Sequence, residues 1–196
     1  MRKILQILFF TACFATTSMA QTKPLSAWQI FAGYSYLRAN VREYYQPTPN
    51  EYSIRDHFAN LNGWNLSATE NVKTWFGGTL DGSGHYGSPQ FQGTKTTQHV
   101  HSLSYGPNFF HQGKHFSPFA HVLVGFTHVS ASASSTSAQA SQTKLLVAPG
   151  GGLDMRLFKY GAIRLFQAEY FRANLQGSSR NQLRVSAGIT FNWTRK

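Results

Sequence analysis

Apolar and polar residues alternate without interruption over Leu183–Trp193, close to the end of the chain. The apolar positions begin at Leu183 and recur at every second residue to Trp193, with Arg184, Ser186 and Asn192 among the polar or small residues between them. A period of two is that of a β-strand with one apolar and one polar face. The stretch also has the length of a tilted strand that crosses a bilayer, about 9–11 residues. It therefore predicts a membrane-spanning β-strand.

The same kind of stretch occurs repeatedly, and the pattern predicts eight strands in all. The other seven are Trp28–Arg38, Gly63–Thr69, Trp75–Tyr86, Gln98–Phe110, His115–Val129, Lys144–Leu157 and Ala162–Arg172. Long predicted loops alternate with short predicted turns. The loops are Ala39–Asn62, Gly87–Thr97, Ser130–Thr143 and Ala173–Asn181, and the turns are Glu70–Thr74, His111–Lys114 and Phe158–Gly161. In the second turn we expect Gly113 to supply a positive φ.

This organisation is typical of an outer-membrane barrel, in which short turns and both termini face the periplasm. The predicted fold class is all-β: an eight-stranded antiparallel up-and-down transmembrane β-barrel. Aromatic residues near strand ends, such as Trp28, Tyr105 and Trp193, suit the two aromatic girdles of such a barrel. A soluble lipocalin-like barrel is the alternative, but it requires an apolar interior. Phe31 and Leu37 are apolar exceptions on an otherwise polar face.

The segment Met1–Ala20 has the three parts of a secretory signal peptide. Arg2 and Lys3 precede a short apolar run, and Ser18-Met19-Ala20 supplies small residues for cleavage. We predict a signal peptide over residues 1–20, an outer-membrane β-barrel domain over residues 21–196, and location in the cell outer membrane. The single cysteine leaves with the signal peptide, so the mature chain forms no disulfide.

The formal net charge of the chain is +11. The Lys and Arg residues are scattered rather than clustered in a run, which disfavours nucleic acid as a partner. Phosphate groups of outer-membrane lipid, including lipopolysaccharide, are the more natural anionic partner.

Five short segments of the chain are similar to segments of a known family. They are Phe31-Ala32-Gly33-Tyr34-Ser35-Tyr36-Leu37-Arg38, Gly63-Trp64-Asn65, Gly82-Ser83-Gly84-His85-Tyr86-Gly87, Gly150-Gly151-Gly152-Leu153-Asp154 and Ser186-Ala187-Gly188-Ile189. They resemble the outer-membrane β-barrel domain family of Gram-negative bacteria, the small porin-like or opacity-type barrels. The resemblance covers about Trp28–Trp193. It implies an eight-stranded barrel inserted by the barrel assembly machinery, but it does not fix an activity.

Four charged residues share the polar faces of their strands and are predicted to point into the lumen: Asp81, Asp154, Arg156 and Arg184. Arg164 and Glu169 are further candidates, but their opposite parity requires a bulge or directs one of them to lipid. An eight-stranded barrel has an interior just wide enough for side chains to fill, and buried charges are costly unless paired. We therefore predict a packed ionic network with a structural role rather than a solute path.

Histidines form a second candidate pattern. His99 and His101 share one strand face, and His57, His85 and His128 are expected near the same end of the barrel. Zinc accepts imidazole ligands, but no cysteine or acidic residue completes the pattern. We therefore predict solvated histidines and no metal.

His128 and Ser130 form a His-x-Ser pair on one strand face, which resembles the pair of lipid A deacylase barrels. A serine hydrolase also needs a carboxylate that orients the histidine. Ser130 opens a predicted Ser/Ala-rich loop, so we favour a chance match and predict neither an enzyme nor a cofactor.

The predicted function is that of a non-enzymatic outer-membrane barrel with a structural or surface-interaction role, in membrane integrity or adhesion. Arg42, Tyr44, Tyr45 and Arg55 in the first loop are the candidate contacts for an extracellular ligand, because aromatic and Arg side chains dominate binding hot spots. A solvated variable loop is the simpler interpretation of these residues. A narrow porin-like passive channel is the main functional alternative, and a lipid A-modifying hydrolase is a minor one.

Overall fold

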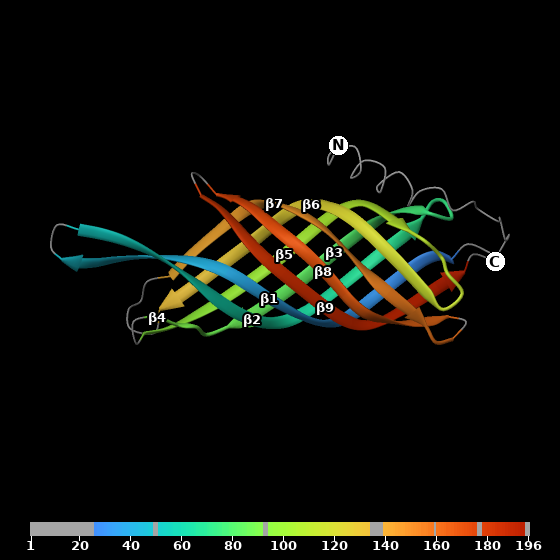
Figure 1. Ribbon diagram of the computed structural model, residues 1–196, viewed down its shortest axis with the longest axis horizontal. Coiled ribbons are helices and arrows are strands. Elements are labelled where there is room, and N and C mark those ends of the chain that lie inside the picture. The colour runs from blue at the N-terminus through green and yellow to red at the C-terminus, as the bar shows by residue number, and fades with distance from the viewer. Residues whose placement is uncertain are drawn as a thin grey trace, which may run out of the picture.

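The computed structural model describes residues 26–48, 51–91, 94–133, 139–158, 160–175 and 178–194. Its strands are β1 (Ser26–Thr48), β2 (Glu51–Asn71), β3 (Phe76–Gly87), β4 (Gln90–Phe91), β5 (Thr94–Phe110), β6 (Phe116–Ala133), β7 (Gln139–Arg156), β8 (Gly161–Leu175) and β9 (Ser178–Thr194). Figure 1 shows them as one elongated barrel of tilted strands. Among the described residues, no helix is long and apolar enough to span a membrane. The predicted signal peptide lies outside these residues and stays a prediction.

The sheet closes on itself through two pairings between strands that are not consecutive in the chain. β1 pairs antiparallel with β9, and β3 pairs antiparallel with β5. The two-residue strand β4 pairs with β5 alone, so eight strands form the wall of the barrel in the described part of the chain. The prediction of a closed eight-stranded antiparallel barrel is confirmed. Closure leaves no sheet edge within the wall, as a membrane interior requires.

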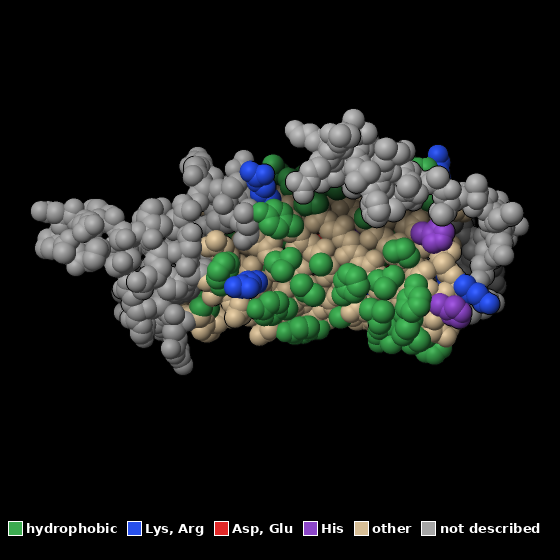
Figure 2. All heavy atoms as spheres, in the orientation of Figure 1, with side chains coloured by type: hydrophobic (Ala, Val, Ile, Leu, Met, Phe, Trp, Pro, Cys, Tyr) green, Lys and Arg blue, Asp and Glu red, His purple; other side chains and the backbone are tan. Residues whose placement is uncertain are grey.

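The alternation in the sequence separates the outside of the wall from the lumen. On β9, Leu183, Ile189 and Phe191 are exposed, whereas Arg184 and Thr190 are fully buried. Figure 2 shows apolar side chains along the visible wall, with basic side chains toward the two ends. A lipocalin-like barrel would have the reverse arrangement. The outward apolar face and inward polar face are those predicted for a membrane barrel.

One end of the barrel, here called the turn end, carries three short turns and the described termini. Ser26 and Thr194 are paired in register there. In one turn, the backbone N–H groups of Val72 and Lys73 both donate to the carbonyl oxygen of Phe76. The prediction that Gly113 supplies a positive φ was wrong, because the φ of Gly113 does not lie in the left-handed region. A Cβ at Gly113 would instead lie 2.0 Å from the carbonyl oxygen of Phe116.

The opposite end of the barrel, here called the hairpin end, departs most from the sequence prediction. Ala39–Asn62 was predicted to be a loop, but β1 and β2 continue as an antiparallel ribbon to the pair Thr48↔Glu51. Figure 1 shows this ribbon extending beyond the rest of the barrel. The prediction failed because two strands can pair through their backbones without an alternating apolar face.

The other three predicted loops are also shorter than expected. β5 begins at Thr94, β6 continues to Ala133 with β7 resuming at Gln139, and β8 and β9 extend to Leu175 and from Ser178. Backbone pairing thus continues past the apolar wall in every wall strand except β3, which ends at Gly87. Hydrophobic alternation marks the part of each strand that faces lipid, and it misses the paired extension beyond.

Candidate functional site

A bulge in β8 brings two charged residues of opposite parity into the lumen. Arg164 pairs with Gly188 of β9 and Gln167 pairs with Ser186, so Leu165 and Phe166 together oppose one residue of β9. Both bulged residues are exposed on the wall, while Arg164 and Glu169 are buried. Of the two outcomes expected from the parity of Arg164 and Glu169, the structure therefore shows the bulge.

The middle of the lumen holds an ionic network centred on Arg184. Its guanidinium Nη2 donates to Oδ1 of Asp81 and to Oε1 of Glu169, each at 2.7 Å, and its Nε donates to Oε2 of Glu169. Asn65 Nδ2 donates to the other oxygen of Asp81 at 2.8 Å. His121 Nε2 lies 3.0 Å from Oε1 of Glu169. We refer to Arg184, Asp81, Glu169 and His121 as the ionic network.

Every member of the ionic network is almost fully buried, and Arg184 has no exposed surface. A charge in such a site is tolerated only when opposite charges and hydrogen bonds replace its water. Two carboxylates on different strands, β3 and β8, converge on one cation from β9. With His121 from β6, the network therefore ties four strands of the wall together through the centre of the tube.

A second buried pair lies nearer the turn end. Arg164 donates through Nε and Nη2 to the two oxygens of Asp154, at 2.7 and 3.1 Å. Gln29 donates to the same carboxylate at 3.1 Å. The guanidinium carbon of Arg164 lies 4.4 Å from the ring centre of Phe31 and 4.2 Å from that of Phe119. Two cation–π contacts thus hold the planar group that the carboxylate binds.

An apolar layer fills the lumen on the hairpin side of the ionic network. It consists of Leu37, Ala39, Ala59, Leu61, Val100, Leu123, Leu146, Ala148 and Phe171. Phe171 links the two regions, because the guanidinium carbon of Arg184 lies 4.6 Å from its ring centre. The inward apolar residues Phe31 and Leu37, exceptions to the polar pattern of their strand, are accounted for by these contacts.

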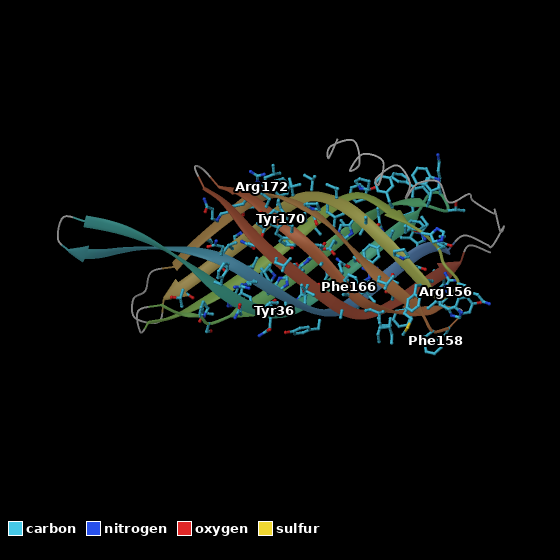
Figure 3. All side chains as sticks on the ribbon, viewed as in Figure 1. Tyr36, Arg156, Phe158, Phe166, Tyr170 and Arg172 are labelled. Atoms are coloured by element: carbon cyan, nitrogen blue, oxygen red, sulfur yellow. The ribbon has the colours of Figure 1, made fainter. Side chains whose placement is uncertain are left out.

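The four residues predicted for the lumen do not form one group. Asp81 and Arg184 share the ionic network, whereas Asp154 pairs with Arg164. Arg156 is half-buried, and within the described residues no hydrogen bond or ion pair joins its side chain to either group. Figure 3 shows Arg156 and Phe158 toward the turn end of the barrel. Correct strand parity did not place Arg156 in the network, because the residue lies too close to the mouth.

Sequence reasoning missed the polar residues that complete both groups. His121 was not assigned to the lumen because Phe119–Phe126 is almost continuously apolar and gives no clear parity. Its buried position follows from the pairing of β6 with β7. Gln167 was missed because the bulge shifts parity within β8, and its Oε1 accepts a hydrogen bond from Arg164.

The histidines expected near one end of the barrel lie on two sides of the wall. His85 is buried in the lumen, where its Nε2 lies 2.8 Å from the hydroxyl of Ser35. His99, His101 and His128 lie on the outer face, and the side chain of His57 lies outside the described residues. No group of three or more His, Cys, Asp or Glu residues that could hold a metal occurs in the described part of the chain.

His128 and Ser130 do not form a hydrolase site with the described residues around them. Nδ1 of His128 lies 2.9 Å from the hydroxyl of Thr143, where a carboxylate would be needed to orient the imidazole. Ser130 does not open a loop, because it lies within β6 directly across from Ser141. The expectation that Ser130 begins a flexible segment was therefore wrong.

The candidate contact residues Arg42, Tyr44, Tyr45 and Arg55 lie on the projecting ribbon rather than in a loop. Register places Arg42 across from Asp56, Arg55 across from Glu43, and Tyr44 and Tyr45 across from Ile54 and Ser53. The backbone of the four residues is described, and their side chains lie outside the described part of the structure. Their role as ligand contacts stays a prediction.

The closed antiparallel barrel, its apolar outer wall and its charged interior define the class of the fold, an eight-stranded transmembrane β-barrel of the outer-membrane type. No protein-family model matches the chain, and no curated protein sequence matches it.

Solved outer-membrane proteins share the fold. Ail, the attachment invasion locus protein of Yersinia pestis, has a TM-score of 0.53 at 17% identity, covering 85% of this chain and 100% of Ail. Neisserial surface protein A has a TM-score of 0.60 at 11% identity, covering 86% of this chain and 98% of that protein. OprG of Pseudomonas aeruginosa has a TM-score of 0.57 at 12% identity, covering 88% and 98%. At these identities the likeness shows the fold alone.

Proposed function

We propose that this chain is a non-enzymatic barrel of the outer membrane that makes surface contacts through the projecting ribbon of β1 and β2. The proposal rests on one observation: the point at which each ribbon strand stops pairing with the wall. β1 pairs with β9 only as far as Arg38↔Leu183, and β2 pairs with β3 only as far as Asn62↔Tyr86. Beyond these points, within the described residues, the two strands pair with each other alone.

The ribbon suits a protein partner better than a polyanion. Its two cations, Arg42 and Arg55, face acidic residues across the ribbon, and Glu51 adds a third carboxylate. Opposite charges across a strand pair stabilise the ribbon itself. Tyr44 and Tyr45 then supply the amphipathic rings that dominate protein interfaces. Ail has been solved in complex with the heparin analogue sucrose octasulfate, so heparin is the natural probe for the polyanion alternative.

Residence in the outer membrane follows from the wall. Large apolar residues from every wall strand are exposed, from Trp28 on β1 to Trp193 on β9. We place the turn end in the periplasm and the hairpin end outside, which is the usual orientation of such barrels. Outer-membrane lipid, lipopolysaccharide and the barrel assembly machinery are the partners this placement implies.

The filled lumen favours a contact role over the channel alternative. Arg184, Phe31, Leu37 and Leu61 are all fully buried inside the tube, so side chains occupy the space that a solute path would need. In planar bilayers the barrel should give no large steady conductance. A stable open channel in most insertions would contradict the closed lumen and favour the passive-channel function.

The contact role is tested by shortening the ribbon while leaving the wall intact. Residues 41–57 are replaced by Asn-Gly, which suits a two-residue turn between the paired residues Asn40 and Phe58. Bacteria that express either chain are scored for attachment to epithelial cell monolayers, with and without added heparin. We expect attachment to fall about tenfold on loss of the ribbon, as the loss of one or more contact hot spots implies, and heparin to have little effect.

A matched control replaces residues 133–138 by Asn-Gly, between the paired residues Ser132 and Gln139 at the same end. Both variants must keep the heat-dependent gel mobility of a folded barrel in the outer-membrane fraction. Equal attachment by all three chains would overturn the contact role.

If cells that lack the protein then became sensitive to detergent, membrane integrity would replace adhesion as its function. Lipid A that lost an acyl chain in a Ser130-dependent manner would establish the hydrolase instead.

A further inference from the structure

The outer wall changes chemistry abruptly between two neighbouring cross-strand pairs of β5 and β6. Leu103 lies directly across from Phe126, and the next outward pair toward the hairpin end is His101 across from His128. The exposed fractions of Leu103 and Phe126 are 60% and 61%, so this pair belongs to the apolar wall. The boundary between lipid chains and headgroups therefore falls at the two imidazoles.

Three histidines meet at this boundary, and we call His99, His101 and His128 the histidine patch. The ring centres of His99 and His101 lie 5.3 and 5.5 Å from that of Tyr86, both in edge-on contact. Nδ1 of His128 is engaged by the hydroxyl of Thr143. These contacts orient the rings from both sides, and within the described residues the contact of His128 uses Nδ1 rather than Nε2.

The acidic residues whose side chains are described lie away from the histidine patch. The sequence has 7 acidic residues. Asp81, Asp154 and Glu169 are buried in the lumen, Glu70 lies next to the turn end, and Glu43, Glu51 and Asp56 lie on the projecting ribbon. Tyr86 is the titratable group that faces the patch from β3, and β7 presents Ser141 and Thr143. Among the described residues, no carboxylate faces the patch.

Other basic residues follow the same boundary around the wall. Arg38 is exposed on β1 and Arg172 is exposed on β8, each two residues outward of a tyrosine. Figure 3 shows Tyr36, Tyr170 and Arg172 toward the hairpin end. The outer rim thus carries cations above an aromatic girdle, where phosphate groups of a bilayer lie.

We propose that the histidine patch binds the phosphate groups of an outer-leaflet lipid, with protonated imidazoles as hydrogen-bond donors. The lipid chains lie along Leu103 and Phe126, and the phosphate meets His101 and His128 one pair further out. The proposal rests on the residence in the outer membrane put forward above, and it does not depend on the role of the projecting ribbon. Because a protonated imidazole carries a positive charge and donates through both ring nitrogens, we expect the contact to strengthen on acidification.

The test measures the retention of bisphosphorylated lipid A by the folded barrel, purified from outer membranes and examined by native mass spectrometry. We expect about fivefold more retained lipid near pH 5.5 than near pH 8, the gain that one cation at a charged headgroup surface provides. Lipid A with the same acyl chains but no phosphates should be retained equally at the two pH values.

The decisive comparison is between two double variants on the same pair of strands. H101Q/H128Q removes two histidines of the patch, and H111Q/H115Q removes two exposed histidines from the turn at the other end of β5 and β6. The first should lose the gain on acidification and the second should keep it. On acidification, lipid phosphate itself loses negative charge near pH 6, but this change is common to all variants.

Two results would overturn the proposal: an undiminished gain in H101Q/H128Q, or the same gain for the lipid without phosphates. Both are separate from failure of the proposed function. A chain with no heat-dependent mobility shift would remove the membrane residence, and a ribbon without effect on attachment would remove the contact role. Neither of those two results is measured in the lipid-retention assay.

Discussion

The lumen is closed by two regions of opposite chemistry, the ionic network and the apolar layer on the hairpin-end side of it. Both fill the same narrow tube with fully buried side chains, and Phe171 belongs to one while contacting the other. They differ in what their stability depends on. The ionic network depends on the charges and hydrogen bonds that join Arg184 and His121 to two carboxylates, whereas the apolar layer depends on filled volume. A closed lumen can therefore be weakened either by unbalancing charge or by removing methyl groups.

The largest effect is expected from Arg184→Leu. It leaves Asp81 and Glu169 buried without their cation, which costs about 3–5 kcal/mol when one partner of a buried pair is removed. The free energy of unfolding in urea, measured for barrels folded in lipid vesicles, checks this value. A loss below about 1 kcal/mol would show that water reaches the network.

The control for Arg184→Leu removes the charges together. Combining it with Asp81→Asn and Glu169→Gln leaves no buried charge unpaired, so most of the lost stability should return. If the triple variant were as unstable as the single one, lost packing rather than unbalanced charge would account for the effect.

The apolar layer should respond to lost volume. Leu123→Ala removes a fully buried side chain from this layer and is expected to cost about 2–4 kcal/mol through lost burial and a cavity. Leu103→Ala on the outer wall is the matched control, because lipid fills the space that it leaves. The same urea titration decides the comparison, and equal losses would argue that the layer is not tightly packed.

A smaller effect is expected at the second buried pair, where Arg164 contacts Asp154 and two aromatic rings. Phe119→Leu keeps an apolar side chain but removes one of the two rings that contact the guanidinium, at an expected cost of about 1 kcal/mol. Phe116→Leu, on the exposed face of the same strand, serves as the control. No difference between the two variants in urea would show that the carboxylate of Asp154 suffices to hold Arg164.

The smallest effect is expected from Arg156→Gln. Its side chain is half-buried near the turn end, away from both buried groups, so the change should stay within about 0.5 kcal/mol. A loss close to that of Arg184→Leu would restore Arg156 to the network that strand parity suggested.

Strand parity predicted the wall and much of the lumen from the sequence. It placed Asp81, Asp154 and Arg184 on inward faces. The opposite parity of Arg164 and Glu169 left either a bulge or one residue toward lipid, and β8 contains the bulge. Parity shows which face of a strand a residue lies on, but not its position along the barrel axis. It therefore did not separate Arg156 from Asp81, Asp154 and Arg184. It also assumed a polar lumen, which made Leu37 an exception rather than a member of an apolar layer.

The projecting ribbon could not be predicted in the same way. Its residues form no apolar face, and Pro47 and Pro49 suggested a loop. The pairing of β1 with β2 is specified by backbone hydrogen bonds and by opposed charges at Arg42 and Glu43, which become visible only once the register is known. Alternation of apolar and polar residues marks the strand segments that contact lipid. It does not predict the paired segments beyond the membrane.

The continuity of β1 and β2 also has a mechanical consequence. Each strand runs unbroken from the turn end, through the wall and into the ribbon. A pull on the tip therefore travels along the strands and loads the β1–β9 and β2–β3 ladders in shear, parallel to their length. Many backbone hydrogen bonds then share the force at once, instead of opening one by one as in peeling. In the proposed contact role, the fold would therefore hold the ribbon against a force applied along β1 and β2.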